Sequence, residues 1–448
     1  MDNIDFIKIF NNVCRMFYLQ RCGCRLSEDM AGEFSHPACH TAAARIYGTA
    51  QYADVGGGWH DAGDYGRYIV PASKAVADLL LANKAAPSIF SDNLNISGPS
   101  NSMPGILEEI KYELIWMKKM QREDGGVYHK VTCAKFPGFV MPQYETDELI
   151  ISPVSTAASG DFAAAMAMAY RIYASLDHAF AQDCLMAAKR AWNFLETTPC
   201  IPFTNPDGII TGEYGDDNDS DERYWAACAL FAATGDKTYH RYIKSNINPA
   251  WAADLGWADV GAYGNAVYLS ISNDVADATV KSAIAMDLFR AADSLVEKSR
   301  DNDYGVFVDD FIWGSNMVVL NNAMLLLMAN DIQPKSEYTV CARRHLDYIL
   351  GNNPMGICYV TGCSDLSAQH PHHRPSVAVG RAMSGMLVGG PDQHLHDACA
   401  QKHLGSVSPA RCYIDDAESY STNEVAIYWN SPLVYVMARL LAAPGSAD

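Results

Sequence analysis

The sequence predicts an all-α protein, in which an inner ring of buried helices lies within an outer ring of amphipathic helices. Long segments rich in Ala, Leu and Met place apolar residues three and four positions apart, the spacing of one helix face. The segments between them gather Gly, Pro, Asn and Asp, and no run shows convincing strand-like alternation. Helices are expected over Ala157–Tyr173, Ala179–Glu196, Asp221–Ala233, Ala276–Ser299, Asn321–Ala329, Tyr338–Leu350 and Glu424–Leu441.

The final helix gives the reason for an inner ring. Its apolar residues, among them Val425, Trp429, Leu433 and Val436, leave almost no polar stripe. A helix that is apolar on all sides is stable only where protein surrounds it. A closed array of helix pairs provides such positions.

The links between helices indicate how the chain is organised. They contain no low-complexity linker and no exact repeat, so the sequence predicts a single domain over residues 1–448. Long Gly-rich links such as Gly212–Asp219 and Gly389–Gln393 are expected to gather at one rim, where functional residues usually lie.

Composition excludes several classes of partner. The 33 Lys and Arg residues stand against 52 Asp and Glu, and the formal net charge of −19 opposes binding to nucleic acid or anionic membranes. The apolar runs are far shorter than the roughly 20 residues of a membrane span. The start, Met1–Phe10, lacks the basic-then-apolar pattern of an export signal. The sequence therefore predicts either an intracellular protein or one that has lost its signal.

The first candidate for chemistry is a Gly-rich loop with two carboxylates, Asp61 and Asp64. Glycines free the backbone on both sides of the pair, and Trp59 and Tyr65 flank it. Two nearby carboxylates can hold a water molecule and accept its proton, and aromatic side chains are common in sugar-binding clefts. A turn with solvated aspartates, or a calcium loop, explains the segment equally well.

The second candidate is Glu424, preceded by the possible N-caps Ser421, Thr422 and Asn423. Burial at the start of an apolar helix raises the pKa of a carboxyl group, which suits a general acid. The positive end of the helix acts in the opposite direction. The alternative is a first-turn Glu that only stabilises the helix dipole.

The third candidate is His370–Ser376, a loop rich in hydrogen-bond donors with a proline near each end. Imidazole and guanidinium groups can bind sugar hydroxyls and orient carboxylates. A metal site or an ordinary surface loop remains an alternative for this segment.

Two further groups suggest metals. Cys22, Cys39, His40 and His60 offer the thiolate and imidazole ligands that zinc prefers, although buried free thiols are the default for cysteines spread through a large chain. The acidic run that ends in Asp221-Glu222 has the oxygen ligands of a calcium site, but an acidic loop with an N-cap fits equally well.

Read together, these segments resemble glycoside hydrolase family 9, the cellulase family with an (α/α)6 barrel. The family's Asp-Ala-Gly-Asp loop is present at Asp61–Asp64, and its Pro-His-x-Arg element at Pro371–Arg374. Its terminal signature is present in full, as Tyr413, Asp415, Tyr420, Asn423, Glu424 and Asn430.

The resemblance implies a role for each of these positions. Glu424 would be the general acid and Asp64 the general base, and the reaction would invert the anomeric configuration. Asp61 would help to hold the water molecule, and Asp415 would be a supporting carboxylate. The residues that would bind sugar are His372, Arg374, Trp313, Tyr420 and Trp59.

The start of the chain resembles a bacterial branch of the family, which has a structural zinc site and usually an immunoglobulin-like module before the barrel. The resemblance assigns the zinc to Cys22, Cys39, His40 and His60. No separate immunoglobulin-like or carbohydrate-binding module is expected in this sequence. The family is mostly secreted, which contrasts with the missing export signal, and a cytoplasmic location is the alternative.

The predicted activity is hydrolysis of β-1,4-glucosidic bonds in cellulose-type glucans by a monomeric endoglucanase without an organic cofactor. The alternatives are an exo-acting cellodextrinase or cellobiohydrolase and an exo-β-glucosaminidase. A non-catalytic carbohydrate-binding protein is a third possibility, but it has no need of Asp61, Asp64 and Glu424 together.

Overall fold

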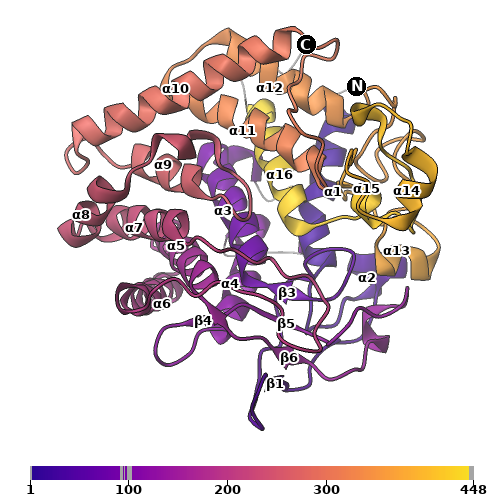
Figure 1. Cartoon of the computed structure of the whole chain (residues 1–448), viewed down its shortest axis with the longest axis horizontal. Helices are drawn as coiled ribbons and strands as arrows, with labels where there is room; N and C mark the ends of the chain where they lie inside the picture. Colours follow the sequence, from indigo (N-terminus) through magenta and orange to yellow (C-terminus); the bar gives the residue numbers. More distant parts are fainter. Residues whose placement is uncertain (1–2, 91–93, 95, 98–102, 443–448) are drawn as a thin grey trace.

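Successive helices alternate between the inside and the outside of a closed ring in the computed structural model, which describes residues 3–90, 94, 96–97 and 103–442. The fold is an (α/α)6 barrel, as predicted (Figure 1). The inner helices are α3 (Ile69–Ala85), α5 (Thr156–Tyr173), α7 (Ser220–Thr234), α9 (Gly261–Leu269), α11 (Ser315–Ile332) and α16 (Ile427–Ala442). The outer helices are α1 (Asn3–Leu19), α4 (Gly105–Lys119), α6 (His178–Thr197), α8 (Lys237–Asn246), α10 (Ala278–Arg300) and α12 (Ser336–Ile349).

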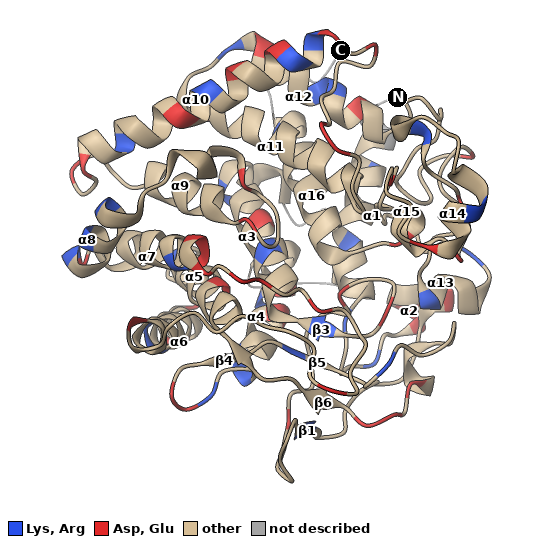
Figure 2. Cartoon of the chain, in the orientation of Figure 1, with Lys and Arg blue, Asp and Glu red and all other residues tan. Residues whose placement is uncertain are grey.

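Residue size and polarity separate the two rings. In α5 every residue from Thr156 to Ala169 is buried, and the many alanines let neighbouring helices approach closely. In α6 the buried residues recur on one face only, as in an ordinary amphipathic helix. Figure 2 shows the same contrast, because charged residues are frequent along the outer helix α10 and sparse on the inner helices α11 and α16.

The last helix closes the ring. α16 packs against α3 and α11 of the inner ring and against α1 on the outside, so the first and last helices of the chain are neighbours. No described helix is both long and apolar enough to cross a membrane.

Side-chain caps mark where several helices begin. Ser155, Asp177, Asp236 and Asp277 each accept a hydrogen bond from a backbone amide of the first turn that follows. Such a cap satisfies an amide that has no partner within the helix, and it is typically worth about 1 kcal/mol.

Short strands lie at one end of the barrel, where the sequence had given no strand signal. A five-stranded sheet has the order β2-β1-β6-β5-β3, and β4 pairs with β7. These strands are two or three residues long, too short for alternation to be recognised in the sequence. Their bounds are β1 (Ala44–Ile46), β2 (Tyr52–Ala53), β3 (Arg67–Tyr68), β4 (Val127–Tyr128), β5 (Lys130–Thr132), β6 (Ile150–Ile151) and β7 (Val154–Ser155).

The remaining regular elements are short and lie in the links. They are the helices α2 (Glu28–Ala31), α13 (Arg374–Val379), α14 (Ala398–Leu404) and α15 (Tyr420–Asn423), and 3-10 turns at Gly32–Phe34, Pro87–Phe90, Pro142–Tyr144, Pro249–Ala253 and Pro409–Arg411.

One predicted boundary is wrong in a way that matters for function. Glu424 does not lie in the first turn of α16, which begins at Ile427. It follows the short helix α15 in an extended conformation, with φ −68° and ψ 162°. Its backbone pairs with His372, and the carbonyl of Glu424 accepts a hydrogen bond from Gly389. Contacts with distant loops, which helix periodicity does not reveal, therefore fix the residue.

Candidate active site and metal centre

A cavity of about 980 Å³ opens at the end of the barrel where the inner helices begin. The Asp61–Asp64 loop lies just before β3 and α3, Glu424 just before α16, and Trp313 just before α11. Its lining residues are Asp61, Ala62, Asp64, Tyr68, Phe136, Gly212, Glu213, Tyr214, Trp257, Ile312, Trp313, His372, Arg374, His394, His396, Tyr420, Glu424, Ala426, Tyr428 and Trp429.

The two aspartates are held by different tyrosines. Asp64 Oδ2 accepts hydrogen bonds from the Gly66 amide at 2.9 Å and the Tyr68 hydroxyl at 3.3 Å. Asp61 Oδ2 accepts one from the Tyr214 hydroxyl at 2.6 Å, and Asp61 Oδ1 has no partner in the described part of the chain. Burial and the nearby Asp64 raise the pKa of Asp61 well above its usual value. Both carboxyl groups line the same cavity, each held by its own tyrosine.

Gly63 allows the loop to approach the other half of the site. A Cβ atom at this position would collide with the carbonyl oxygen of His372 and lie 3.3 Å from Glu424 Oε1. Arg374 fixes the approach, because its Nη1 donates to the Gly63 carbonyl at 2.8 Å and its backbone amide donates to the same oxygen at 3.1 Å. Any side chain at residue 63 would push the two halves apart.

Glu424 lines the same cavity as the two aspartates, and the Gly63 backbone between them contributes a hydrogen bond to its carboxyl group. Burial is the main cause that raises its pKa well above the ordinary glutamate value, and the Asp64 carboxylate adds to it. Arg374 acts in the opposite direction, but it does not cancel these effects. A carboxyl group in this state holds its proton near neutral pH, which is the property of a general acid.

The His-rich loop separates into three roles. The His372 side chain lines the cavity, and its Nδ1 donates to the Ala417 carbonyl at 2.5 Å, which leaves Nε2 available to a ligand. The next residue, His373, is buried between Ser376 and Gln20 and has no place in the cavity. The His370 side chain is exposed.

Asp415 does not line the cavity. Its carboxylate accepts hydrogen bonds from the backbone amides of Gln369 and His370, at 2.8 and 2.9 Å, and from the Asn423 side chain at 3.0 Å. Asp415 therefore joins the loop that carries His372 to the residue that precedes Glu424. It positions the site rather than facing the reacting space.

The structure places two of the three predicted sugar-stacking residues at the cavity and the third in the core. Trp313 and Tyr420 are 40% and 36% exposed, and their ring centroids lie 5.2 Å apart on the wall of the cavity. Trp59, expected to contribute stacking surface, is 1% exposed, packs on Phe17 and does not line the cavity. Its indole nitrogen donates to Glu109 at 2.8 Å, so it belongs to the core beneath the aspartate loop.

Several lining residues were missed from the sequence, above all Tyr214. Its φ of +49° is unusual for a residue other than glycine, and its ring packs against Tyr68, Trp257 and Tyr428. A tyrosine within the Gly-rich link 212–219 was the available signal. The other missed side chains come from distant links, from β3 and from the first turn of α16, and their spacing in sequence gives no indication of proximity. They are Tyr68, Phe136, Glu213, Trp257, His394, His396, Tyr428 and Trp429.

The predicted zinc ligands come together. The ligand atoms of Cys22, Cys39, His40 and His60 all lie within 4.8 Å of one another. Cys22 Sγ is 3.6 Å from His40 Nδ1, and Cys39 Sγ is 3.7 Å from His60 Nε2. Tetrahedral zinc, with bonds of about 2.3 Å to sulfur and 2.0 Å to nitrogen, requires sulfur–nitrogen separations of about 3.6 Å. The donor set therefore fits a four-coordinate metal ion.

A further carboxylate orients this cluster. His40 Nε2 lies 2.8 Å from Glu145 Oε2, the arrangement in which a carboxylate fixes the tautomer of a ligating histidine. His60 directly precedes Asp61, and its backbone amide donates to the Gln20 carbonyl. A metal ion here would anchor the first residue of the aspartate loop.

The calcium interpretation of Asp221 and Glu222 gains no support. Asp221 accepts a hydrogen bond from the Val260 amide at 2.8 Å, while the oxygens of Glu222 are buried without partners among the described residues. Burial, with repulsion from Asp161, raises the pKa of Glu222. Within the described ranges, the Cys22 cluster is the only group of three or more metal-binding side chains with suitably close ligand atoms.

With this geometry in hand, comparison with known proteins defines the class. The sequence pattern of Glycosyl hydrolase family 9 matches residues 6–437. The chain belongs to this family and is a glycoside hydrolase. It is 38% identical to a cellodextrinase of Butyrivibrio fibrisolvens over 98% of this chain and 85% of that protein. It is 36% identical to endoglucanase D of Acetivibrio thermocellus over 94% of this chain and 67% of that protein.

Solved structures agree with the fold. A single mutant of a thermostable endoglucanase from Alicyclobacillus acidocaldarius superposes with a TM-score of 0.93 at 43% identity, over 98% of this chain and 84% of that one. A Zn-binding triple mutant of the family 9 endoglucanase J30 gives 0.92 at 32% identity, over 97% and 84% of the two chains.

Proposed function

We propose that this protein hydrolyses β-1,4-glucosidic bonds in cellulose-type glucans, with inversion of configuration and within the chain rather than from its ends. The observation that carries the proposal is the meeting of Asp61, Asp64 and Glu424 in one aromatic-lined cavity. The cavity volume of about 980 Å³ lies at the upper end of what small-molecule sites offer, which suits several sugar units.

Glu424 acts as the general acid in this proposal. Its raised pKa keeps the carboxyl protonated, so that it can donate to the glycosidic oxygen as the bond to the anomeric carbon breaks. The rigid extended backbone at residue 424, held by Gly389 and His372, keeps the proton at one place while the substrate is bound.

Asp64 acts as the general base toward a water molecule on the opposite face of the sugar ring. Its Oδ2 accepts hydrogen bonds from Gly66 and Tyr68, which fixes the direction of the carboxylate. Asp61 is positioned by Tyr214 and holds the same water through its second oxygen. An inverting enzyme requires such a water between base and sugar, with the acid and base carboxyls about 6.5–9.5 Å apart.

The remaining residues orient the glucan. Trp313 and Tyr420 offer ring faces to the apolar faces of glucose units, and His372 offers Nε2 to a hydroxyl group. Arg374 lines the cavity, and two N–H groups of its guanidinium donate to protein carbonyls, Nε to Pro137 and Nη1 to Gly63. We therefore assign Arg374 to positioning the aspartate loop more than to binding sugar.

We further propose zinc as the ion at Cys22, Cys39, His40 and His60, in a structural role. All four ligand positions are filled by protein, so no open position is left for a substrate or a reactive water. When bound, the ion would cross-link the segment around residue 22, the Cys39-His40 turn and the start of the aspartate loop.

Product analysis tests the catalytic proposal. Soluble β-1,4-glucan and chitosan oligosaccharides are incubated with the enzyme, and early products are separated by chromatography, with Glu424→Gln as the control. A spread of cello-oligosaccharides that is absent in the control supports endo-action and the acid together. Release of glucosamine from chitosan would instead show a glucosaminidase.

Exo-action on cello-oligosaccharides is the second candidate, because a relative of 38% identity is a cellodextrinase. A single small product released from chain ends, with little loss of viscosity in a long soluble glucan, would favour it. Rapid loss of viscosity at low conversion would support the endoglucanase.

A further inference from the structure

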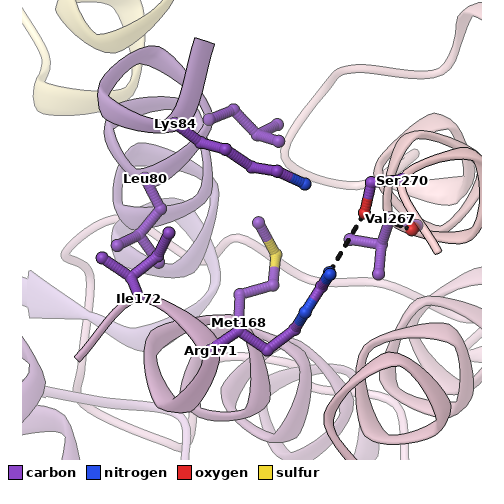
Figure 3. A pocket seen from close by; sticks show the side chains of 8 residues that line it. Leu80, Lys84, Met168, Arg171, Ile172, Val267 and Ser270 are labelled. Atoms are coloured by element: carbon purple, nitrogen blue, oxygen red, sulfur yellow. Dashed lines mark hydrogen bonds between the residues drawn. The ribbon is translucent and has the colours of Figure 1, made fainter. Parts of the chain in front are cut away.

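A second cavity lies at the opposite end of the barrel from the catalytic cleft. The inner helices begin near the catalytic aspartates and Glu424, so their last turns meet at the far end. Lys84 lies in the last turn of α3, Arg171 in the last turn of α5, and Ser270 directly after α9. Figure 3 shows the Lys84 ammonium and the Arg171 guanidinium extending into the same space, toward Ser270.

Two cations line this space without an acidic partner. Arg171 Nη1 donates to the Ser270 hydroxyl at 3.0 Å, and Ser270 in turn donates to the Val267 carbonyl at 2.7 Å. In the part of the chain that the structure describes, neither Lys84 nor Arg171 has an ion pair with a carboxylate. In a chain of net charge −19, two neighbouring cations without a counter-charge are a selective place for an anion.

Electrostatics agrees with this geometry. Lys84 is an exposed residue, yet desolvation by its surroundings and repulsion by Arg171 lower its pKa to about 8. The C-terminal ends of α3 and α5 carry partial negative charge, which favours one cation at each end. This effect explains why the two residues are basic, but not why both extend into one cavity.

The walls of the cavity are apolar. The chamber, about 120 Å³ in volume, is bounded by Leu80, Leu81, Met168, Ile172 and Val267 in addition to the polar groups. A single water needs only about 10–15 Å³, so there is room for a ligand of several heavy atoms.

A second chamber of about 290 Å³ continues from the first and shares Leu81, Lys84 and Ser270 as lining residues. Its walls include Leu288 and Met328, and its one lining carboxylate, Asp331, is ion-paired with Arg439. Together the two chambers join a cationic head site to an apolar extension.

We propose that this end of the barrel binds an amphiphilic carboxylate, with its carboxylate group between Lys84 and Arg171 and its aliphatic part along the apolar walls toward Leu288 and Met328. An inorganic anion such as phosphate suits the site less well, because its further oxygens would lose hydration against the apolar residues that make up the rest of the lining. The aliphatic part of a carboxylate gains free energy from the same walls.

Calorimetric titration of the full chain with hexanoate, acetate and 1-hexanol separates the two parts of the site. Hexanoate should bind saturably and at least about tenfold more tightly than acetate, because each buried methylene strengthens binding up to about fourfold. It should also bind more tightly than 1-hexanol, which has the apolar part without the charge. Equal binding of hexanoate and 1-hexanol would reduce the site to an apolar cavity and overturn the proposal.

Variants locate the ligand. Lys84→Met and Arg171→Met should each weaken hexanoate binding about tenfold or more, the usual effect of losing a charged hydrogen bond. Lys244→Met is the matched control, because Lys244 also lies in the last turn of a helix but lines neither chamber. Thermal melts establish that each variant is folded. Unchanged hexanoate affinity in both cavity variants, or no saturable binding to the unmodified protein, would refute the site.

The pH dependence gives a readout that needs no variant. Lys84 is charged below its pKa of about 8, so hexanoate affinity should fall between pH 6.5 and pH 9. Acetate should follow the same trend and 1-hexanol should not. Hexanoate affinity that stays constant over this range would exclude Lys84 as its partner.

Discussion

The buried carboxyl groups that line the cavity and the buried carboxylate of Asp78, deeper in the barrel, differ in how many hydrogen-bond partners they have. Asp78 lies on α3, further along the helix that follows the aspartate loop, and its carboxylate accepts from Lys74 at 2.7 Å, Tyr263 at 2.6 Å and Ser431 at 2.7 Å. These partners come from α3, α9 and α16, so one carboxylate joins three inner helices. Asp61, in the cleft, has one hydroxyl donor and one oxygen without a partner among the described residues.

The number of hydrogen-bond partners distinguishes a buried carboxylate that stabilises packing from a buried carboxyl group that can exchange a proton. The oxygens of Asp78 are matched by a buried cation and two hydroxyl groups, so this carboxylate fixes the packing around it. A carboxyl group that is buried with fewer partners, such as Glu424 or Asp61, has a raised pKa and can exchange a proton with a ligand. Asp78 on the one hand, and Asp61 and Glu424 on the other, thus differ in their hydrogen-bond partners although all three are buried.

The largest effect is expected for the cleft. Glu424→Gln and Asp64→Asn should each lower kcat about 10³-fold or more, because each removes a proton transfer that the remaining groups cannot replace. The folded structure should persist, since both changes are nearly isosteric. Steady-state kinetics with circular dichroism measures this, and a variant that keeps near wild-type turnover would refute the role assigned to that residue.

Disruption of the Lys74–Asp78 ion pair should lower stability and leave turnover unchanged. Asp78→Asn leaves Lys74 buried without a counter-charge, so it should cost about 3–5 kcal/mol of unfolding free energy. The folded fraction should retain its kcat. Chemical denaturation measures the loss, with Glu337→Gln as the control, because the ion pair of Glu337 with Arg300 is exposed and should contribute little to stability. Similar losses of unfolding free energy in the two variants would show that the buried pair of Lys74 and Asp78 contributes no more than an exposed one.

Loss of an ion from the Cys22 cluster should have an intermediate effect on stability and on activity. Untreated protein should contain about one zinc per chain, and removal of the ion should cost about 2 kcal/mol or more of stability and lower activity through the aspartate loop. Cys22→Ser should lose the metal, whereas Cys24→Ser, two residues away and outside the cluster, should keep it. Metal analysis and thermal melts decide this, and a metal-free preparation of full stability would rule the site out.

The smallest expected effect is a pH dependence of the stability difference between Glu424→Gln and the wild type. The pKa of Glu424 is raised in the folded state, so the folded protein binds a proton more tightly there than the unfolded chain does. The stability that this proton provides is complete below the unfolded pKa and is lost as pH rises through the folded pKa. Glu424→Gln should therefore gain stability relative to the wild type as pH rises from 5 to 8. If the stability difference between the two proteins did not change with pH, the pKa of Glu424 would not be raised in the folded state.

Much of the site was predictable because family 9 motifs are local in sequence. Asp61–Asp64, Pro371–Arg374 and Asn423-Glu424 could be read directly, and the resemblance assigned Cys22, Cys39, His40 and His60 as candidate metal ligands, whose ligand atoms do lie together. Trp59 and Trp313 show the limit. Both lie in Gly-rich segments next to candidate residues, yet one is 1% and the other 40% exposed. The local sequence contains nothing that tells which tryptophan faces the cavity.

Helix periodicity and composition alone determined the all-α class, the alternation of buried and amphipathic helices and most helix positions, because each depends on residues within a few turns of one another. Only the tertiary structure decided the rest. Tyr214 contacts Asp61 although the two residues are 153 positions apart in sequence. Glu424 lies before the last helix rather than in its first turn. Lys84, Arg171 and Ser270 line one cavity at the far end of the barrel. These relations depend on contacts between segments distant in the chain, and such contacts leave no period or motif in the sequence.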